Sequence, residues 1–251
     1  MIDSSSLQLQ LFKDNRSNKD PSFVGSSGAL YIGTTPDGAK YLIKHTYPHN
    51  ASNEFAACWL AEKIGAYTPK AYLLSADKRF ASQYAVAIEF IEGLEFFEKD
   101  AVQNKSDLIS QFALNILICA DDILQLNRVG NRIISYDFSE SFNMTELSMR
   151  LALNTLSYNS EIGIEQISRL LDGFRYYLHL QCFDFPGLAR EFHLDPKDMR
   201  QGLIGVGKRV LDITEEELEE LSDELCNLYP TAVAVYYEEC IRAMQQLMNS
   251  F

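Results

Sequence analysis

The hydrophobic pattern of the chain changes near Gly93, and this change limits the folds that its 251 residues can adopt. Before Gly93, short apolar runs typical of β-strands are interrupted by one stretch with helical spacing, residues 51–65. After Gly93 the spacing is helical almost to the end, apart from a short excursion at residues 121–142. This order predicts an α+β fold of two lobes, a small β-rich lobe with one helix and a larger, mostly helical lobe.

The same pattern predicts a single domain made of three segments. Residues 1–22 are polar and predict a partly ordered lead-in, residues 23–93 form the small lobe, and residues 94–251 form the helical lobe. The apolar fraction of 47% is ordinary for a globular protein, so a chain of this length can bury a core.

The small lobe is expected to begin with a β-hairpin. Apolar runs lie on both sides of residues 36–38, Pro-Asp-Gly, which favour a turn, and the second run ends near Lys44. In the helix that follows, the apolar residues form one stripe, Glu54 lies away from that stripe, and Gly65 is placed to end the helix. A further strand is expected at residues 84–91.

The excursion after the next helix carries a group of polar residues with a distinctive spacing. Asp121 and Asp122 are adjacent, Asn127 follows, and a strand-like run then ends at Asp137. Amide and carboxylate oxygens are the ligands that Mg²⁺ prefers, so Asn127 and Asp137 are candidate metal ligands. Asp122, five residues before Asn127 on the predicted loop, is a candidate catalytic carboxylate that orients an attacking hydroxyl group.

These residues fit the requirements of phosphoryl transfer from ATP, which depends on positioning and charge neutralisation. Lys44 can hold the phosphates, and Glu54 can pair with Lys44 and keep it extended. The small residues 25–28 can lie over the phosphates, and the connector at 89–91 can offer backbone groups to adenine. The candidate ATP-binding residues are Gly25, Ser26, Ser27, Gly28, Lys44, Glu54, Glu89, Phe90 and Ile91.

Two blocks of this sequence resemble the HipA-like kinases, a bacterial branch of the protein-kinase-like fold. The run GALYIGTTPDGAKYLIKH, followed by SNEFAACWLAEKIGAYTPKAYLL, is similar to a small lobe in which a hairpin lysine precedes a helix that begins with Asn-Glu. The run CADDILQLN, followed by IISYDFSESF, is similar to the catalytic loop and metal-binding strand of that family. The resemblance covers residues 25–145 and implies a two-lobed kinase-like fold that uses ATP and Mg²⁺.

The resemblance also implies a role for each matching residue. Lys44 would contact the ATP phosphates with the support of Glu54, and Asp122 would be the catalytic carboxylate. Asn127 and Asp137 would hold Mg²⁺, and the connector after the last strand of the small lobe would contact adenine. The phosphate acceptor would be a Ser or Thr residue of a protein.

The sequence departs from the family in the loop between the candidate catalytic acid and the asparagine. Asp121 stands where the family usually has a basic or polar residue, and the apolar run ILQL precedes Asn127. These departures keep open a pseudokinase that binds nucleotide or a partner without catalysis. A small-molecule phosphotransferase of the antibiotic-modifying type shares the same lobes, and in a helical adaptor the acids would only form turns and caps.

The overall charge restricts the partners and the cellular location that we expect. A net charge of −13 repels phosphate backbones and anionic lipid, which argues against nucleic acid as a partner. No apolar run reaches the roughly 18–20 residues that span a bilayer, so we expect no membrane insertion. With no secretory signal at its start, the chain is expected to be cytoplasmic, and its pattern does not predict an oligomeric state.

Overall fold

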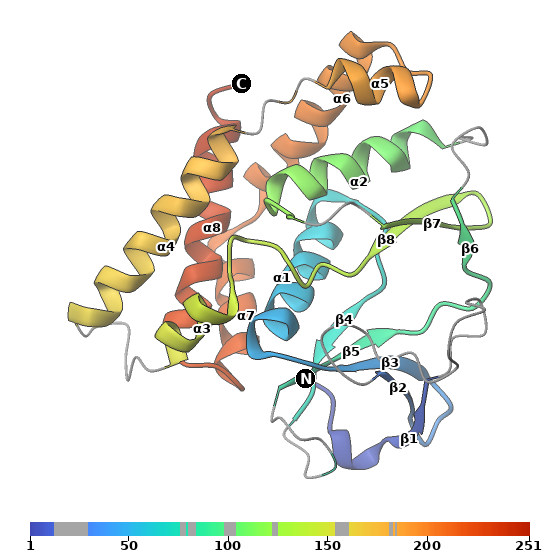
Figure 1. The fold of residues 1–251 in the computed structure, drawn as a ribbon, viewed down its shortest axis with the longest axis vertical. Coiled ribbons are helices and arrows are strands. Elements are labelled where there is room, and N and C mark those ends of the chain that lie inside the picture. Colours follow the sequence, from blue (N-terminus) through green and yellow to red (C-terminus); the bar gives the residue numbers. More distant parts are fainter. Residues whose placement is uncertain are drawn as a thin grey trace.

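Two antiparallel sheets and a set of helices make up the part of the chain that the structure describes (Figure 1). The structure is a computed structural model that describes residues 1–12, 30–75, 79, 84–97, 104–121, 125–153, 161–180, 183 and 185–251. The strands are β1 (Gln8–Leu11), β2 (Leu30–Thr34), β3 (Lys40–His45), β4 (Ala71–Leu73), β5 (Ala85–Glu89), β6 (Glu95–Phe96), β7 (Gln125–Val129) and β8 (Arg132–Tyr136). The α-helices are α1 (Pro48–Ile64), α2 (Lys105–Leu117), α3 (Glu146–Leu153), α4 (Glu161–Leu180), α5 (Pro186–Glu191), α6 (Pro196–Gly207), α7 (Glu215–Cys226) and α8 (Thr231–Met248), with short 3₁₀ helices at Ser4–Ser6 (η1) and Lys208–Asp212 (η3).

The larger sheet has five strands in the order β1-β2-β3-β5-β4, and every neighbouring pair is antiparallel. The predicted hairpin is confirmed, because β2 and β3 pair with Leu30 opposite Lys44 and Thr34 opposite Lys40. The turn between them passes through Gly38, whose φ of 92° is a conformation that glycine adopts without steric cost. The strand expected at residues 84–91 is β5, in the interior of this sheet.

The edge strand β1 is a departure from the expected polar lead-in. Gln8 pairs with Thr34 and Leu11 with Tyr31, so the start of the chain extends the sheet. The backbone N–H of Ile2 also donates to the carbonyl of Leu73 on the opposite edge of the sheet (2.9 Å). Four residues with alternating polarity give little burial, and the strand is defined mainly by its backbone hydrogen bonds to β2.

Helix α1 joins the sheet to the helical part of the molecule. It begins at Pro48, a residue favoured in the first turn of a helix, and ends at Gly65, which has a left-handed φ of 74° as expected. It contacts β4 and β5 on one side and α2, α3 and α7 elsewhere (Figure 1). Residues on every side of α1 are therefore buried, which a single apolar stripe does not predict.

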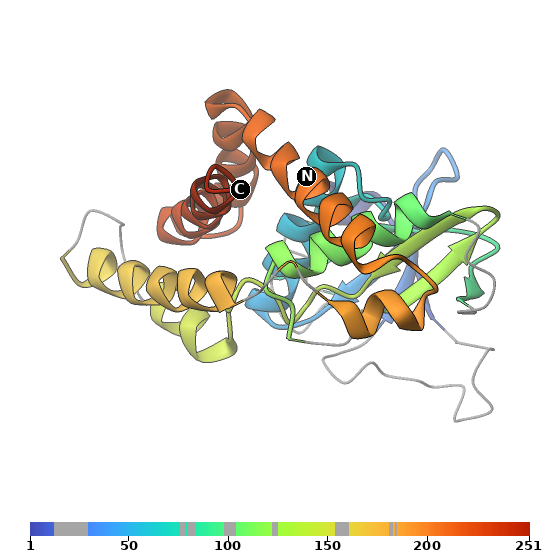
Figure 2. The same ribbon diagram turned by 90° about the horizontal axis from the view of Figure 1, so that it is seen from above.

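The helical part packs around α8. Tyr236 and Tyr237, in the middle of α8, are fully buried, and the helix contacts α3, α4 and α7. Seen from above, α4 and α8 lie on one side of the molecule and the β7–β8 hairpin lies on the other (Figure 2). A capping box formed by Thr214 and Glu217 begins α7. Among the described residues, no helix is long and apolar enough to cross a membrane.

The excursion at residues 121–142 contains the β7–β8 hairpin, which forms a three-stranded sheet with β6. Two side chains of α2 attach β8 to the helix. Asp107 accepts hydrogen bonds from Arg132 Nε (2.7 Å) and from the backbone N–H of Ile133 (3.1 Å). Gln111, which is fully buried, accepts a hydrogen bond from the hydroxyl of Ser135 and donates one to the Ile133 carbonyl (3.2 Å).

Candidate active site

Three of the candidate residues meet in one ion cluster between the sheet and the helical part. Lys44 projects from β3, Glu54 from α1, and Asp137 from the residue after β8. The ammonium group of Lys44 donates to Glu54 Oε1 and lies 2.8 Å from Asp137 Oδ1. Glu54 is 1% exposed and Lys44 14%, whereas Asp137 is 36% exposed, so the cluster opens to solvent on the side of Asp137.

The cluster sets the charges of Lys44 and Asp137, whereas burial raises the pKa of Glu54 in spite of the neighbouring Lys44. Burial alone would lower the pKa of Lys44, but the neighbouring carboxylates outweigh this effect and hold its pKa above the ordinary value. Burial alone would raise the pKa of Asp137, but Lys44 and the hydroxyl of Ser139 hold that pKa below its ordinary value. At neutral pH the site therefore presents an ammonium group beside an ionised, partly exposed carboxylate.

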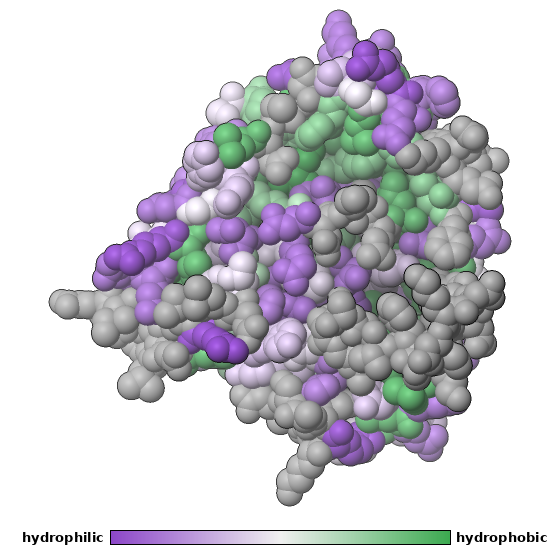
Figure 3. Space-filling view, in the orientation of Figure 1, coloured by the Kyte–Doolittle hydropathy of each residue, from purple (hydrophilic) through white to green (hydrophobic). Residues whose placement is uncertain are grey.

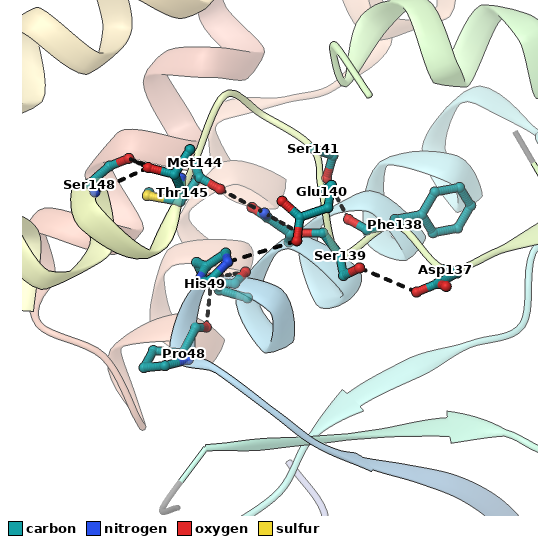
Figure 4. A network of polar contacts seen from close by, with 12 residues as sticks. Pro48, His49, Asp137, Phe138, Ser139, Glu140, Ser141, Met144, Thr145 and Ser148 are labelled. Atoms are coloured by element: carbon teal, nitrogen blue, oxygen red, sulfur yellow. Dashed lines mark hydrogen bonds and ion pairs between the residues drawn. The ribbon is translucent and has the colours of Figure 1, made fainter. Parts of the chain in front are cut away.

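Asp137 occupies an unusual backbone conformation at the start of a turn that leads to α3. Its φ is 71°, a left-handed value that few residues other than glycine adopt. The hydroxyl of Ser139 donates to Asp137 Oδ1 (3.3 Å), and Figure 4 shows the two side chains facing each other. Strained backbone of this kind persists only where surrounding contacts hold it, and it is frequent at functional sites.

The turn after Asp137 is paired with the end of the helix before the candidate catalytic acid. The backbone N–H of Asp121 donates to the carbonyl of Glu140 (3.0 Å), and that of Phe142 donates to the carbonyl of Ile118 (2.6 Å). These two hydrogen bonds bring the residue next to Asp122 beside the turn that follows Asp137. On the face seen in Figure 3, hydrophilic residues occupy the middle, where Figure 1 draws the segment between β8 and α3.

Asn127 lies within strand β7 and not on a loop, which corrects the expected position. Its side chain is 3% exposed, and its carbonyl oxygen Oδ1 has no hydrogen-bond partner among the described residues. A buried polar atom without a partner is rare in folded proteins and points to a missing ion or water. Asn127 is level with Ile134 on β8, so it lies about 10 Å along the ladder from Asp137.

The predicted adenine connector begins at the end of β5, where part of its backbone is already engaged. The N–H of Glu89 donates to the carbonyl of Lys70 (2.8 Å), and the N–H of Phe90 donates to the carbonyl of Lys40 (3.0 Å). Neither N–H group is free to contact a base. A backbone donor from this connector to adenine would therefore have to lie at Ile91 or later.

Several candidate residues lie outside the described part of the chain. These are Gly25, Ser26, Ser27 and Gly28 of the expected phosphate loop, and Asp122, the expected catalytic carboxylate. Sequence reasoning missed Asn53, next to Glu54 on α1, and Asp107 and Gln111 on α2. Asn53 had a signal in the sequence, because an asparagine inside a helix needs a hydrogen-bond partner. Asp107 and Gln111 act through contacts with β8 and, for Gln111, with the carbonyl of Tyr67, which the sequence does not reveal.

The described residues contain no group of three or more His, Cys, Asp or Glu side chains able to hold a metal ion. A site formed by one carboxylate and one amide oxygen suits Mg²⁺, which is usually bound by one or two protein groups together with water and substrate phosphates. Asp137 and Asn127 carry donor atoms of the kind that Mg²⁺ prefers, but the two residues lie about 10 Å apart along the ladder, so they do not form a preformed metal site in this structure.

Comparison with known proteins identifies the fold and leaves the family open. No protein-family model matches the chain, and no curated protein matches its sequence. The structure is similar to the crystal structure of a Helicobacter pylori proinflammatory kinase, CtkA, with a TM-score of 0.54 and 11% sequence identity, over 96% of this chain and 98% of that chain. A 618-residue N-terminal fragment of LepB from Legionella pneumophila has 15% sequence identity over 85% of this chain and 46% of that chain. Its TM-score of 0.37 is too low to support any statement about the fold. This protein therefore has a two-lobed, kinase-like α+β fold, with an antiparallel sheet in its N-terminal part and helices in most of the remainder.

Proposed function

We propose that this protein is an ATP- and Mg²⁺-dependent kinase of the HipA-like type that phosphorylates a Ser or Thr hydroxyl of a protein. The observation that carries the proposal is the contact of Lys44 with both Glu54 and Asp137 across the two parts of the fold. A phosphotransferase needs a cation for the phosphates, an acid that orients this cation and an oxygen ligand for the metal, all within one site. The kinase-like fold adds independent support.

In this proposal each residue has a limited role. Lys44, held extended by Glu54, contacts phosphate oxygens of ATP, and the small residues 25–28 close over them. Asp137 and Asn127 would hold Mg²⁺, which would neutralise charge on the phosphates; because the two residues lie about 10 Å apart along the ladder, their side chains would have to converge on the ion when it binds. The pairing of Lys44 with Asp137 keeps the two groups in place before the nucleotide enters.

Asp122 accepts the proton of the attacking hydroxyl group. The hydroxyl oxygen forms a bond to the γ-phosphorus, and the bond from that phosphorus to the β,γ-bridging oxygen breaks. ADP then leaves with the electron pair of that bond. The proposal assigns this reaction to the cytoplasm, where ATP is available. We also propose that residues 23–93 and residues 94–251 are the two lobes of a single kinase-like domain.

The test is an assay of purified protein with Mg²⁺ and ATP that follows ADP formation and intact mass, with and without a basic protein as acceptor. The wild type is expected to produce ADP and phosphorylated protein, and both signals are expected to disappear in Asp122→Ala and Asp137→Ala. Lys40→Ala is the matched control, because Lys40 lies on the same strand as Lys44 but only pairs with exposed Glu92.

Other outcomes distinguish the alternatives. ADP that forms only when an aminoglycoside-like small molecule is added would indicate a small-molecule phosphotransferase. Stabilisation by Mg-ATP without turnover, lost in Asp137→Ala, would indicate a pseudokinase. No response to nucleotide in any assay would contradict the proposal.

A further inference from the structure

Asn53, the residue before Glu54 on α1, forms a complete set of buried hydrogen bonds. Its side chain is 0% exposed, and its Nδ2 group donates to the carbonyls of Ser139 (2.7 Å) and Met144 (3.3 Å). Its Oδ1 atom accepts a hydrogen bond from the hydroxyl of Tyr237 on α8 (2.7 Å). Because an amide has two donor hydrogens on one side and an acceptor on the other, only asparagine satisfies all three partners in this orientation.

The segment that Asn53 holds, residues 137–144, is the turn that carries the proposed metal ligand. Asp137, Phe142 and Asn143 have φ values of 71°, 56° and 53°, so three residues other than glycine are left-handed within it. Such a turn needs contacts from outside to stay in place. Figure 4 shows Ser139 and Met144, whose carbonyls Asn53 binds, at two separate points of the turn, with Asp137 beside Ser139.

Helix α1 therefore controls two parts of the site through adjacent residues. Glu54 orients Lys44, and Asn53 fixes the backbone two residues after Asp137. Tyr237 connects this pair to the core of the helical part, because its hydroxyl also contacts the hydroxyl of Ser52 (2.7 Å) and its ring is fully buried. A second tyrosine, Tyr236, donates to the carbonyl of Phe142 in the same turn.

We propose that Asn53, oriented by Tyr237, is a positioning residue that sets the affinity of the site for the metal ion by holding the turn after Asp137. This inference rests on the proposed function, because it assumes that Asp137 binds Mg²⁺ together with ATP. In this proposal Asn53 does not contact the substrate. It acts through the backbone of Ser139 and Met144, so its loss affects metal binding more than nucleotide binding.

The experiment compares Asn53→Asp and Tyr237→Phe with Tyr229→Phe. In Asn53→Asp the shape is kept but the two donors are lost, and a carboxylate faces two carbonyls. Tyr237→Phe removes only the hydroxyl that orients Asn53. Tyr229→Phe is the matched control, since Tyr229 is also buried and its hydroxyl donates to α1, at the carbonyl of Pro48 (2.9 Å), but it does not reach Asn53.

Mn²⁺, a spin-active substitute for Mg²⁺, is titrated into each protein with saturating ATP and followed by electron paramagnetic resonance. Metal-free nucleotide binding and thermal stability are measured in parallel. The dissociation constant for Mn²⁺ is expected to rise about tenfold in Asn53→Asp and by a smaller factor in Tyr237→Phe, and to stay unchanged in Tyr229→Phe. Metal-free nucleotide binding is expected to change in none of the three.

Each remaining outcome is decisive. If the wild type binds Mn²⁺ with ATP and all variants bind it equally, Asn53 is only structural and the inference fails while the proposed function stands. If Tyr229→Phe weakens Mn²⁺ binding as much as Tyr237→Phe, the effect is one of general stability and the inference fails as well. If the wild type binds no Mn²⁺ with ATP, the proposed function fails and the inference falls with it.

Discussion

The ammonium group of Lys44 lies 2.8 Å from a carboxylate oxygen of Asp137, although the two residues are 93 positions apart in the chain. One is on a strand of the five-stranded sheet and the other follows the last strand of the smaller sheet. The contact therefore forms only when the two parts of the fold meet correctly. It makes the ion cluster a sensitive point for both stability and activity.

Removal of Lys44 is expected to destabilise the fold. In Lys44→Met, the almost fully buried carboxyl group of Glu54, whose pKa burial already raises, loses the cation that compensates its burial, so we expect a loss of about 3–5 kcal/mol in the free energy of unfolding. The double variant Lys44→Met/Glu54→Gln is expected to recover part of that loss, because a neutral amide replaces the buried carboxyl group that has lost its cation. Urea unfolding of the two variants and the wild type measures the difference, and a double variant less stable than Lys44→Met would contradict the explanation.

The lowered pKa of Asp137 predicts an acid-dependent contribution to stability. A carboxyl group with a lowered pKa in the folded state stabilises the protein above its unfolded pKa, about 3.9, and this stabilisation is lost as the pH falls through the folded pKa. The stability advantage of the wild type over Asp137→Asn is therefore expected to be constant from pH 7 to 5 and to shrink below about pH 4. Urea unfolding at a series of pH values tests this, and an advantage that does not change with pH would show that Asp137 is not held ionised by Lys44.

The contact between α2 and β8 is expected to matter more than the surface ion pairs. Asp107→Ala leaves the N–H of Ile133 without its partner, so we expect a loss of about 1–3 kcal/mol in the free energy of unfolding. Arg169→Ala, which removes an exposed pair with Glu165 on α4, is the control and is expected to cost about 0.5 kcal/mol or less. Equal losses in chemical denaturation would mean that Asp107 does not anchor the hairpin.

Local patterns predicted the elements of this fold better than they predicted its contacts. The hairpin before Lys44 and the helix that ends at Gly65 depend on residues close in sequence, and both are confirmed. The burial of Glu54 depends on which helices surround α1, and no periodicity within residues 51–65 reveals it.

The position of Asn127 shows a second limit. Its spacing from Asp122 predicts a loop residue, yet it lies within a strand, because its backbone pairs with β6 and β8. Backbone pairing between segments separated in sequence cannot be read from the spacing of polar residues. The role of Asn127 as a metal ligand stays a prediction, and its amide oxygen has no hydrogen-bond partner among the described residues.

The unpaired oxygen of Asn127 leads to a prediction that separates stability from metal binding. In Asn127→Leu a side chain of similar size replaces a buried amide whose oxygen makes no hydrogen bond with the described residues, so we expect the free energy of unfolding without ligands to change by about 1 kcal/mol or less. Stabilisation by Mg-ATP, measured as the rise in melting temperature at saturating nucleotide, is expected to be lost, because the oxygen that would face the metal is gone. Asn131→Leu, in the exposed turn between β7 and β8, is the control and is expected to keep the full rise. A large loss of stability in ligand-free Asn127→Leu would mean that the amide has a structural partner, and a full response to Mg-ATP in that variant would remove Asn127 from the metal site.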